Sequence, residues 1–157
     1  MKVTLLSILL LFCLNASSQR ICIGSVTNSI KIGSLAGNKN LVFGIKNIAE
    51  EAILDKGYSV VEKNDSTPKI NFEVIYFDVL QTNTGVSVFH KNNNETIIRI
   101  KGTLTQEGKK SKEYIAVGKS SEISTSTMIV DEGGGFNQAS ARSALKKTII
   151  NLIENLL

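Results

Sequence analysis

The chain contains few of the residues that carry catalytic or crosslinking chemistry. Its 157 residues include one histidine, two cysteines, one proline and no tryptophan. The histidine, His90, lies in a polar stretch, and its spacing from other residues assigns it no catalytic partner. The histidine, the cysteines and the scattered carboxylates also lack the spacing of a metal site. We therefore predict no catalytic residue, no metal site and no cofactor.

A hydrophobic run long enough to cross a membrane is also missing. The stretch from Val3 to Leu14 is almost wholly apolar but has only 12 residues, whereas a membrane-spanning helix needs about 20. It follows a positively charged start and precedes small residues at Ala16 and Ser18, which is the order of a secretory signal peptide. We expect residues 1–18 to be this signal peptide, cleaved after Ser18. The alternative is a buried first helix or strand.

The residues before each cysteine argue against a lipid anchor. A bacterial lipidation site has a small residue directly before the modified cysteine, whereas Phe12 precedes Cys13 and Ile21 precedes Cys22. We therefore expect no lipid anchor and a periplasmic or secreted protein.

Residues 19–157 are enough for a single domain with its own core. Cys22 is the only cysteine in this part, so an internal disulfide is excluded. We expect Cys22 to be buried or, alternatively, to pair with another chain. Loss of Lys2 lowers the formal net charge from +4 to +3, and the remaining basic residues are dispersed. This distribution is not that of a nucleic-acid-binding surface.

Apolar periodicity and turn residues predict elements in the order β-α-β-β-β-β-α. Asn40 and Asn137 are good N-caps for the two helices, and Gly57 is placed to end the first helix in a left-handed conformation. Long adjacent strands joined by short turns favour antiparallel pairing. We therefore expect an α+β two-layer sandwich, with a mostly antiparallel sheet of four to five strands and two helices on one face. The expected strands are 21–26, 58–62, 70–80, 96–105 and 113–125.

The strand expected at 70–80 is apolar on both faces. Strict alternation would place Phe72, Val74 and Tyr76 on one face and the apolar residues between and after them on the other. Two helices can cover only one face, and an uncovered apolar face commonly marks a protein contact. Alternatively, the polar segment 81–94, expected as a connection with at most a short strand at 86–89, covers it. The expected protein-contact surface consists of Ile75, Phe77, Val79 and Ile97.

Several segments of the chain together resemble the corresponding segments of a known domain. They are the signal-like start, the strand at 21–26, the helix end at 56–58 and residues 67–74, Thr-Pro-Lys-Ile-Asn-Phe-Glu-Val. These segments resemble the bacterial envelope domain shared by the curli secretion lipoprotein CsgG and the penicillin-binding-protein activator LpoB. Residues 137–157 are similar to the final helix of that domain, and the lipopolysaccharide-assembly lipoprotein LptE has a similar plan of two helices and four strands. The resemblance implies a non-catalytic module that binds an envelope partner or assembles.

We therefore expect an exported, non-catalytic binding or assembly module of the bacterial cell envelope. Its partner would be an envelope protein or a second copy of the chain, bound through a face of the sheet. One alternative is a secreted protease inhibitor of the cystatin type, because Gln81–Gly85 resembles the Gln-x-Val-x-Gly loop of that family. A small hydrolase whose active site the sequence does not reveal is another.

Overall fold

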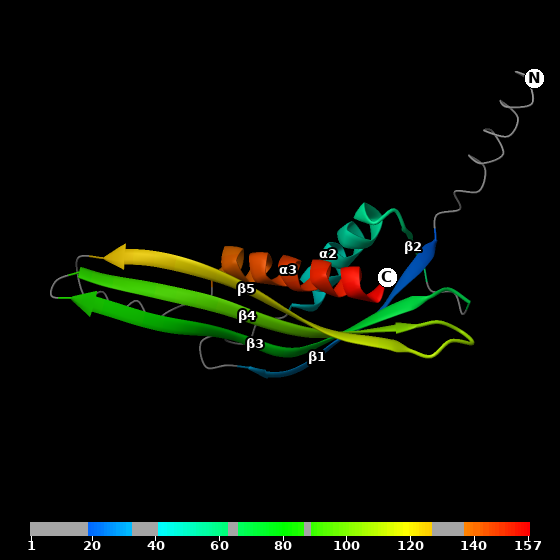
Figure 1. Ribbon diagram of the computed structural model, residues 1–157, viewed down its shortest axis with the longest axis horizontal. Coiled ribbons are helices and arrows are strands. Elements are labelled where there is room, and N and C mark those ends of the chain that lie inside the picture. Colours follow the sequence, from blue (N-terminus) through cyan, green and yellow to red (C-terminus); the bar gives the residue numbers. More distant parts are fainter. Residues whose placement is uncertain (1–18, 33–40, 63–65, 87–88, 127–136) are drawn as a thin grey trace, which may run out of the picture.

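The computed structural model describes residues 19–32, 41–62, 66–86, 89–126 and 137–157 (Figure 1). The predicted order of elements is confirmed, although several strands are longer than expected. The expected signal peptide, residues 1–18, lies outside the described residues. The elements are β1 (Arg20–Ile32), α2 (Val42–Asp55), β2 (Ser59–Val61), β3 (Lys69–Val86), β4 (Phe89–Thr105), β5 (Lys112–Ser126) and α3 (Gln138–Leu156).

The described strands form one sheet in the order β2-β1-β3-β4-β5. β1 pairs in parallel with both β2 and β3, whereas β3 and β4, and β4 and β5, are antiparallel pairs. The expectation of a mostly antiparallel sheet is therefore wrong, because the sheet is mixed. The crossover through α2 returns the chain so that β2 runs beside β1 in the same direction, and β3 then takes the other side of β1.

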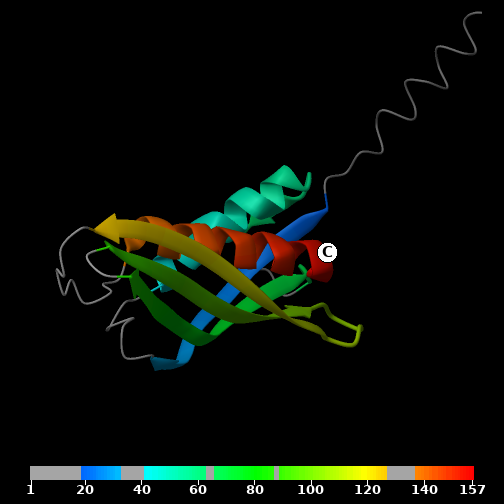
Figure 2. The ribbon, with the colours of Figure 1, turned by 60° about the vertical axis from the view of Figure 1, so that its left-hand side comes forward.

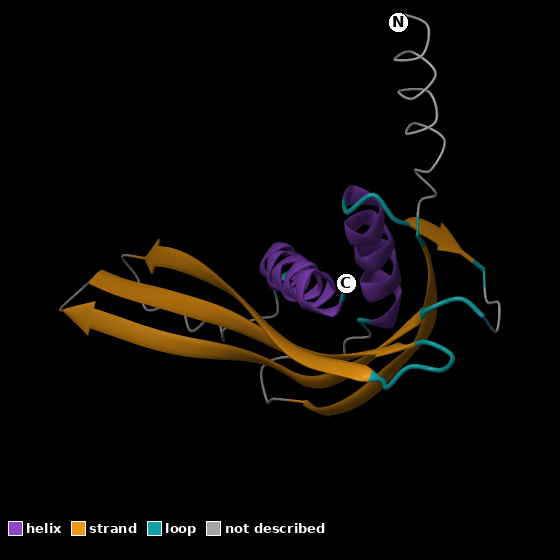
Figure 3. Ribbon diagram, turned by 45° about the vertical axis from the view of Figure 1, so that its right-hand side comes forward, coloured by secondary structure: helices purple, strands orange, loops and turns teal. Residues whose placement is uncertain are grey.

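The sheet curls around the helices like half of a barrel, and it is not the flat layer of a two-layer sandwich (Figure 3). Both helices lie inside the curve, so the prediction of two helices on one face is confirmed (Figures 2 and 3). We call the side of the sheet that carries the helices the inner face and the opposite side the outer face.

The hydrophobic core lies between the inner face and the two helices. α3 packs on β4 and β5, and α2 packs on β1 and on α3. From α2, the side chains of Ile45, Ala49 and Ile53 are fully buried. The predicted apolar stripe of α3 is also buried, and it consists of Ala141, Leu145, Ile149, Leu152, Ile153 and Leu156.

The polar segment 81–94 belongs to the sheet. Gln81 of β3 pairs with Asn94 of β4, and Thr84 pairs with Lys91. The expectation of a connection here is wrong, because backbone hydrogen bonds hold a strand in a ladder whatever the polarity of its side chains. β5 pairs with the same stretch of β4. The strands β3, β4 and β5 therefore continue past the N-terminal end of α3 (Figure 1). The segment therefore does not fold over the outer face.

The two predicted N-caps have different outcomes. The Asn137 side chain accepts hydrogen bonds from the N–H groups of Ala139 at 2.8 Å and Ser140 at 3.1 Å, which confirms it as the cap of α3. Asn40 lies outside the described residues. The residue directly before α2 is Leu41, whose side chain makes no capping hydrogen bond.

Candidate binding surface on the outer face of the sheet

A β-bulge in β3 decides which apolar residues face the core. The register between β3 and β4 shifts between Val74 and Tyr76, which leaves Ile75 as an extra residue in β3. One extra residue reverses the alternation of the strand, so Phe77 lies on the same side as Phe72 and Val74. All three side chains belong to the buried core, where Phe77 is 0% exposed.

The face assignment made from strict alternation is therefore wrong. Phe77 and Val79 are buried on the inner face, and Ile75 is the half-buried bulge residue. Ile97 does lie on the outer face, in register between Asp78 of β3 and Lys119 of β5, but it is only 7% exposed. The four residues predicted as a contact surface do not form an exposed surface in this chain.

The exposed apolar residues of the outer face lie mainly on β5. Ile115 is 53% exposed and Val117 is 44% exposed, and we call these two residues the β5 apolar pair. They lie on the outer face because Ala116, between them, is buried against the helices. Farther along the outer face, Ile123 of β5 and Leu80 of β3 are also exposed.

Close packing of α3 favours small residues on the inner face of β5 at positions 116 and 118. A Cβ atom added to Gly118 would lie 2.1 Å from the backbone oxygen of Ala144 in α3. One added to Gly102, on the neighbouring strand, would lie 2.3 Å from the Leu152 side chain. The inner face of the sheet therefore accepts only small residues under α3 at these places. The alternation of small and large residues in Ala116-Val117-Gly118 was the sequence signal for this, and the prediction missed it.

Charged side chains border the β5 apolar pair. Glu113, two residues before Ile115, forms an ion pair of 3.0 Å with Lys101 of β4. Lys119, two residues after Val117, forms one of 3.4 Å with Glu95 of β4. Both pairs are substantially exposed and contribute little to folding. Each end of the apolar pair therefore carries one carboxylate and one ammonium group, and the β5 residue is the acidic one at position 113 and the basic one at position 119.

β5 is also the last strand of the sheet on its side. It pairs with β4 without a register shift from Ser126 to Lys112, and no described strand pairs with its other edge. The ammonium group of Lys147 in α3 donates a hydrogen bond to the backbone oxygen of Lys119 at 3.1 Å. A long, regular edge with exposed apolar side chains is a template for pairing with another strand. The outer face and the free edge of β5 together form our candidate binding surface.

His90 and Cys22 are the remaining residues that the sequence analysis considered as candidates for catalysis or metal binding. His90 lies in β4, in register with Gly85 and Ser126. Cys22, in β1, is a free cysteine and is buried. In the part of the chain that the structure describes, no group of three or more His, Cys, Asp or Glu side chains is arranged to hold a metal ion. Neither described helix combines the length and the apolar character that crossing a membrane requires.

Comparisons with known proteins give likeness at the level of solved structures. No known protein family matches the sequence, and no curated protein matches it either. Protein XCC0632 from Xanthomonas campestris is similar with a TM-score of 0.47 and 13% identity, over 88% of this chain and 80% of that one.

Two further similar structures are bacterial lipoproteins by name. Lipoprotein GNA1162 from Neisseria meningitidis has a TM-score of 0.44 and 12% identity, over 87% of this chain and 99% of that one. Rare lipoprotein B from Shewanella oneidensis has a TM-score of 0.38 and 11% identity, over 85% of this chain and 90% of that one. At these values the likeness is one of overall arrangement, and no functional residue is carried over.

Proposed function

We propose that the protein is an exported, non-catalytic binding or assembly module of the bacterial cell envelope. It binds a protein partner through the outer face of the sheet and the free edge of β5. The observation that carries this proposal is the β5 apolar pair, whose side chains are 53% and 44% exposed beside an edge without a described strand partner. Exposed apolar groups bordered by charges are typical of protein contact surfaces.

The sequence supports the remaining parts of the proposal. The positively charged start, apolar stretch and small residues of positions 1–18 are typical of an exported protein. The resemblance to the domain of CsgG and LpoB fits a module that works by binding. The single histidine, with no partner assigned by spacing, favours a role without catalysis.

The alternative of a cystatin-type inhibitor has no observation in its favour. The segment Gln81–Gly85, expected as part of a polar connection, lies within β3. Each of its residues is in register with a residue of β4, from Gln81 with Asn94 to Gly85 with His90. A segment held in a ladder in this way is not a loop free to enter a protease active site.

Photo-crosslinking in the native host tests the proposal. A photoreactive amino acid at Ile115 is expected to give adducts with a protein of the envelope. Leu54, on α2, is the matched control, because it is also aliphatic and is 52% exposed, close to the 53% of Ile115. Adducts should be absent or much weaker at position 54. Equal adducts at both positions, or none at position 115, would contradict the proposed binding surface.

A further inference from the structure

The backbone groups at the free edge of β5 belong to alternate residues. Lys147 reaches the backbone oxygen of Lys119 from α3, at 3.1 Å, which places this carbonyl group at the edge away from β4. In an antiparallel ladder, successive residues direct their N–H and C=O groups to opposite sides of the strand. Residues 113, 115, 117 and 119 therefore offer their backbone groups to a strand that adds to this edge. The same residues direct their side chains to the outer face.

The outer-face residues of β5 nearest Ala116 are arranged so that an antiparallel copy of the strand complements them. Ile115 and Val117 flank this residue at a distance of one position, and Glu113 and Lys119 flank it at a distance of three. If a twofold axis passes at Ala116, an identical antiparallel strand places Ile115 of each copy opposite Val117 of the other. The same axis places Glu113 of each copy opposite Lys119 of the other. Both contacts join residues whose backbone groups point to the shared edge, as an antiparallel ladder requires.

If the twofold axis is moved by one residue in either direction, apolar residues no longer face apolar ones and opposite charges no longer face each other. An axis at Ile115 would place Glu113 opposite Val117 and Lys119 opposite Ser111. An axis at Val117 would place Ile115 opposite Lys119 and Glu113 opposite Ser121. In both registers charged groups meet apolar or neutral ones, whereas the axis at Ala116 joins apolar to apolar and negative to positive. Cross-strand pairs of these two kinds stabilise antiparallel sheets.

We propose that a second copy of this chain pairs antiparallel with β5, with the twofold axis at Ala116, so that two sheets join into one. The inference deepens the proposed function, on which it rests, by naming the occupant of the binding surface. The occupant is argued from charge complementarity, because the edge presents its own complement when turned by the twofold axis. Glu113 and Lys119 each have an ion-pair partner on β4, but both side chains are still 56% exposed and can also face the second copy. Pairing requires Lys147 to release the Lys119 carbonyl, and in the single chain this lysine protects the edge from other strands.

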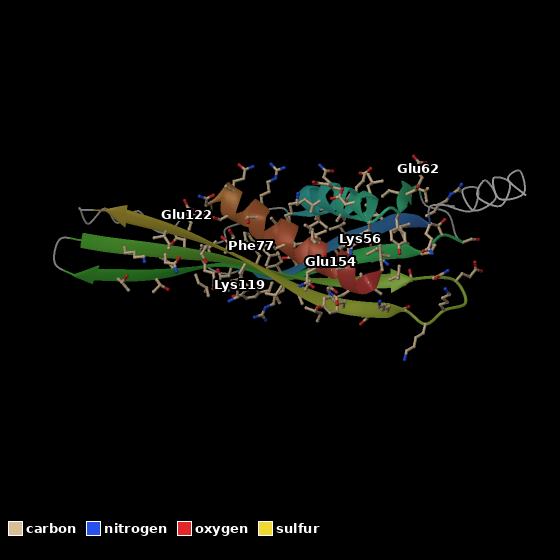
Figure 4. The ribbon with its side chains drawn as sticks, turned by 45° about the horizontal axis from the view of Figure 1, so that its top comes forward. Lys56, Glu62, Phe77, Lys119, Glu122 and Glu154 are labelled. Atoms are coloured by element: carbon tan, nitrogen blue, oxygen red, sulfur yellow. The ribbon has the colours of Figure 1, made fainter. Side chains whose placement is uncertain are left out.

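Charge exchange at the two ends of the interface tests the register (Figure 4 shows Lys119 on β5). In Glu113→Lys, two lysines meet across the axis at each end of the interface. In Lys119→Glu, two glutamates meet in the same way. Each variant alone is expected to dimerise about tenfold more weakly than the wild type. An equimolar mixture of the two variants restores opposite charges at both ends, because the lysines of one chain meet the glutamates of the other.

Sedimentation equilibrium of the purified exported protein is the measurement. The expected result is a dissociation constant for the homodimer that is about tenfold higher for each variant alone than for the wild type, and heterodimers in the mixture. The mixture also serves as the control for folding, because a misfolded variant would not regain association. A monomeric wild type, variants that dimerise like the wild type, or a mixture that associates no better than its components would overturn the inference.

The outcome separates this inference from the proposed function. If the wild type is monomeric while position 115 crosslinks to a different envelope protein, the binding surface stands and the second copy is the wrong occupant. If the adducts at position 115 have twice the mass of the chain, both proposals are supported together.

Discussion

Gly57 ends α2 in the left-handed conformation that its place after Lys56 predicted. Its φ is +82°, a value that glycine adopts without a steric penalty. The N–H of Gly57 donates to the Leu54 oxygen at 2.8 Å, and the N–H of Tyr58 donates to the Ile53 oxygen at 3.3 Å. These two bonds form a Schellman motif, which satisfies carbonyl groups at the end of the helix.

Replacing this glycine tests the backbone conformation alone. Gly57→Ala is expected to lower the free energy of unfolding by about 1 kcal/mol, because a Cβ is disfavoured at this φ. No atom lies within 4 Å of the added Cβ, so a steric clash does not contribute. Chemical denaturation measures the change, and Gly57→Asn should lose less because asparagine tolerates the left-handed region. An unchanged midpoint for Gly57→Ala would contradict the cap.

In β3, one extra residue changes which face of the sheet each apolar side chain takes. Without the bulge at Ile75, alternation would send Phe72 and Phe77 to opposite faces, and with it both enter the same core. The apolar residues of β3 that strict alternation divides between two faces therefore lie mostly on the inner face, in the core. Bulges of this kind bend a strand and increase its twist, which suits a sheet that curls around two helices (Figure 3).

Phe77→Lys tests the inward orientation that the bulge gives to this residue. The variant places a charge in the core, where Phe77 is 0% exposed. We expect the free energy of unfolding to fall by at least about 3 kcal/mol, because even Phe→Ala costs about 3–5 kcal/mol in a core and the charge adds to that cost. Leu80→Lys is the control on the same strand, and as a surface substitution it should change stability by about 0.5 kcal/mol or less. Thermal denaturation measures both, and similar melting temperatures would show that Phe77 is not in the core.

For the whole molecule, the expected removal of residues 1–18 remains a prediction. The basic start, the apolar stretch from Val3 to Leu14 and the small residues at Ala16 and Ser18 motivate it. Intact mass and N-terminal sequencing of the protein from the periplasm or culture medium should give Gln19 as the first residue, as glutamine or in its cyclised form. Recovery of the chain from the cytoplasm with Met1 retained would contradict export with cleavage.

The sequence by itself determined the order of the elements, the two helices, the start of α3 and the end of α2. These features depend on local signals, such as the apolar stripe of α3, the cap at Asn137 and the left-handed residue Gly57. The buried side of α3 was predictable because an amphipathic helix has a single apolar stripe, which must face the core. The turn between the strands expected at 96–105 and 113–125 was also predictable from local signals, because this stretch is charged and contains Gly108, which has a positive φ of 72°.

Tertiary structure alone decided the pairing of the strands and the faces of β3 and β5. Whether β1 pairs in parallel depends on where β2 and β3 settle beside it, and the sequence of β1 does not contain that information. The polar ends of β3 and β4 became strands because each supplied backbone partners for the other. On β5, the close approach of α3 admits Ala116 and Gly118 inward and leaves Ile115 and Val117 outward, against the ordinary rule that large apolar residues are buried. The candidate site therefore arises from packing between elements distant in sequence, and for that reason periodicity within one strand did not locate it.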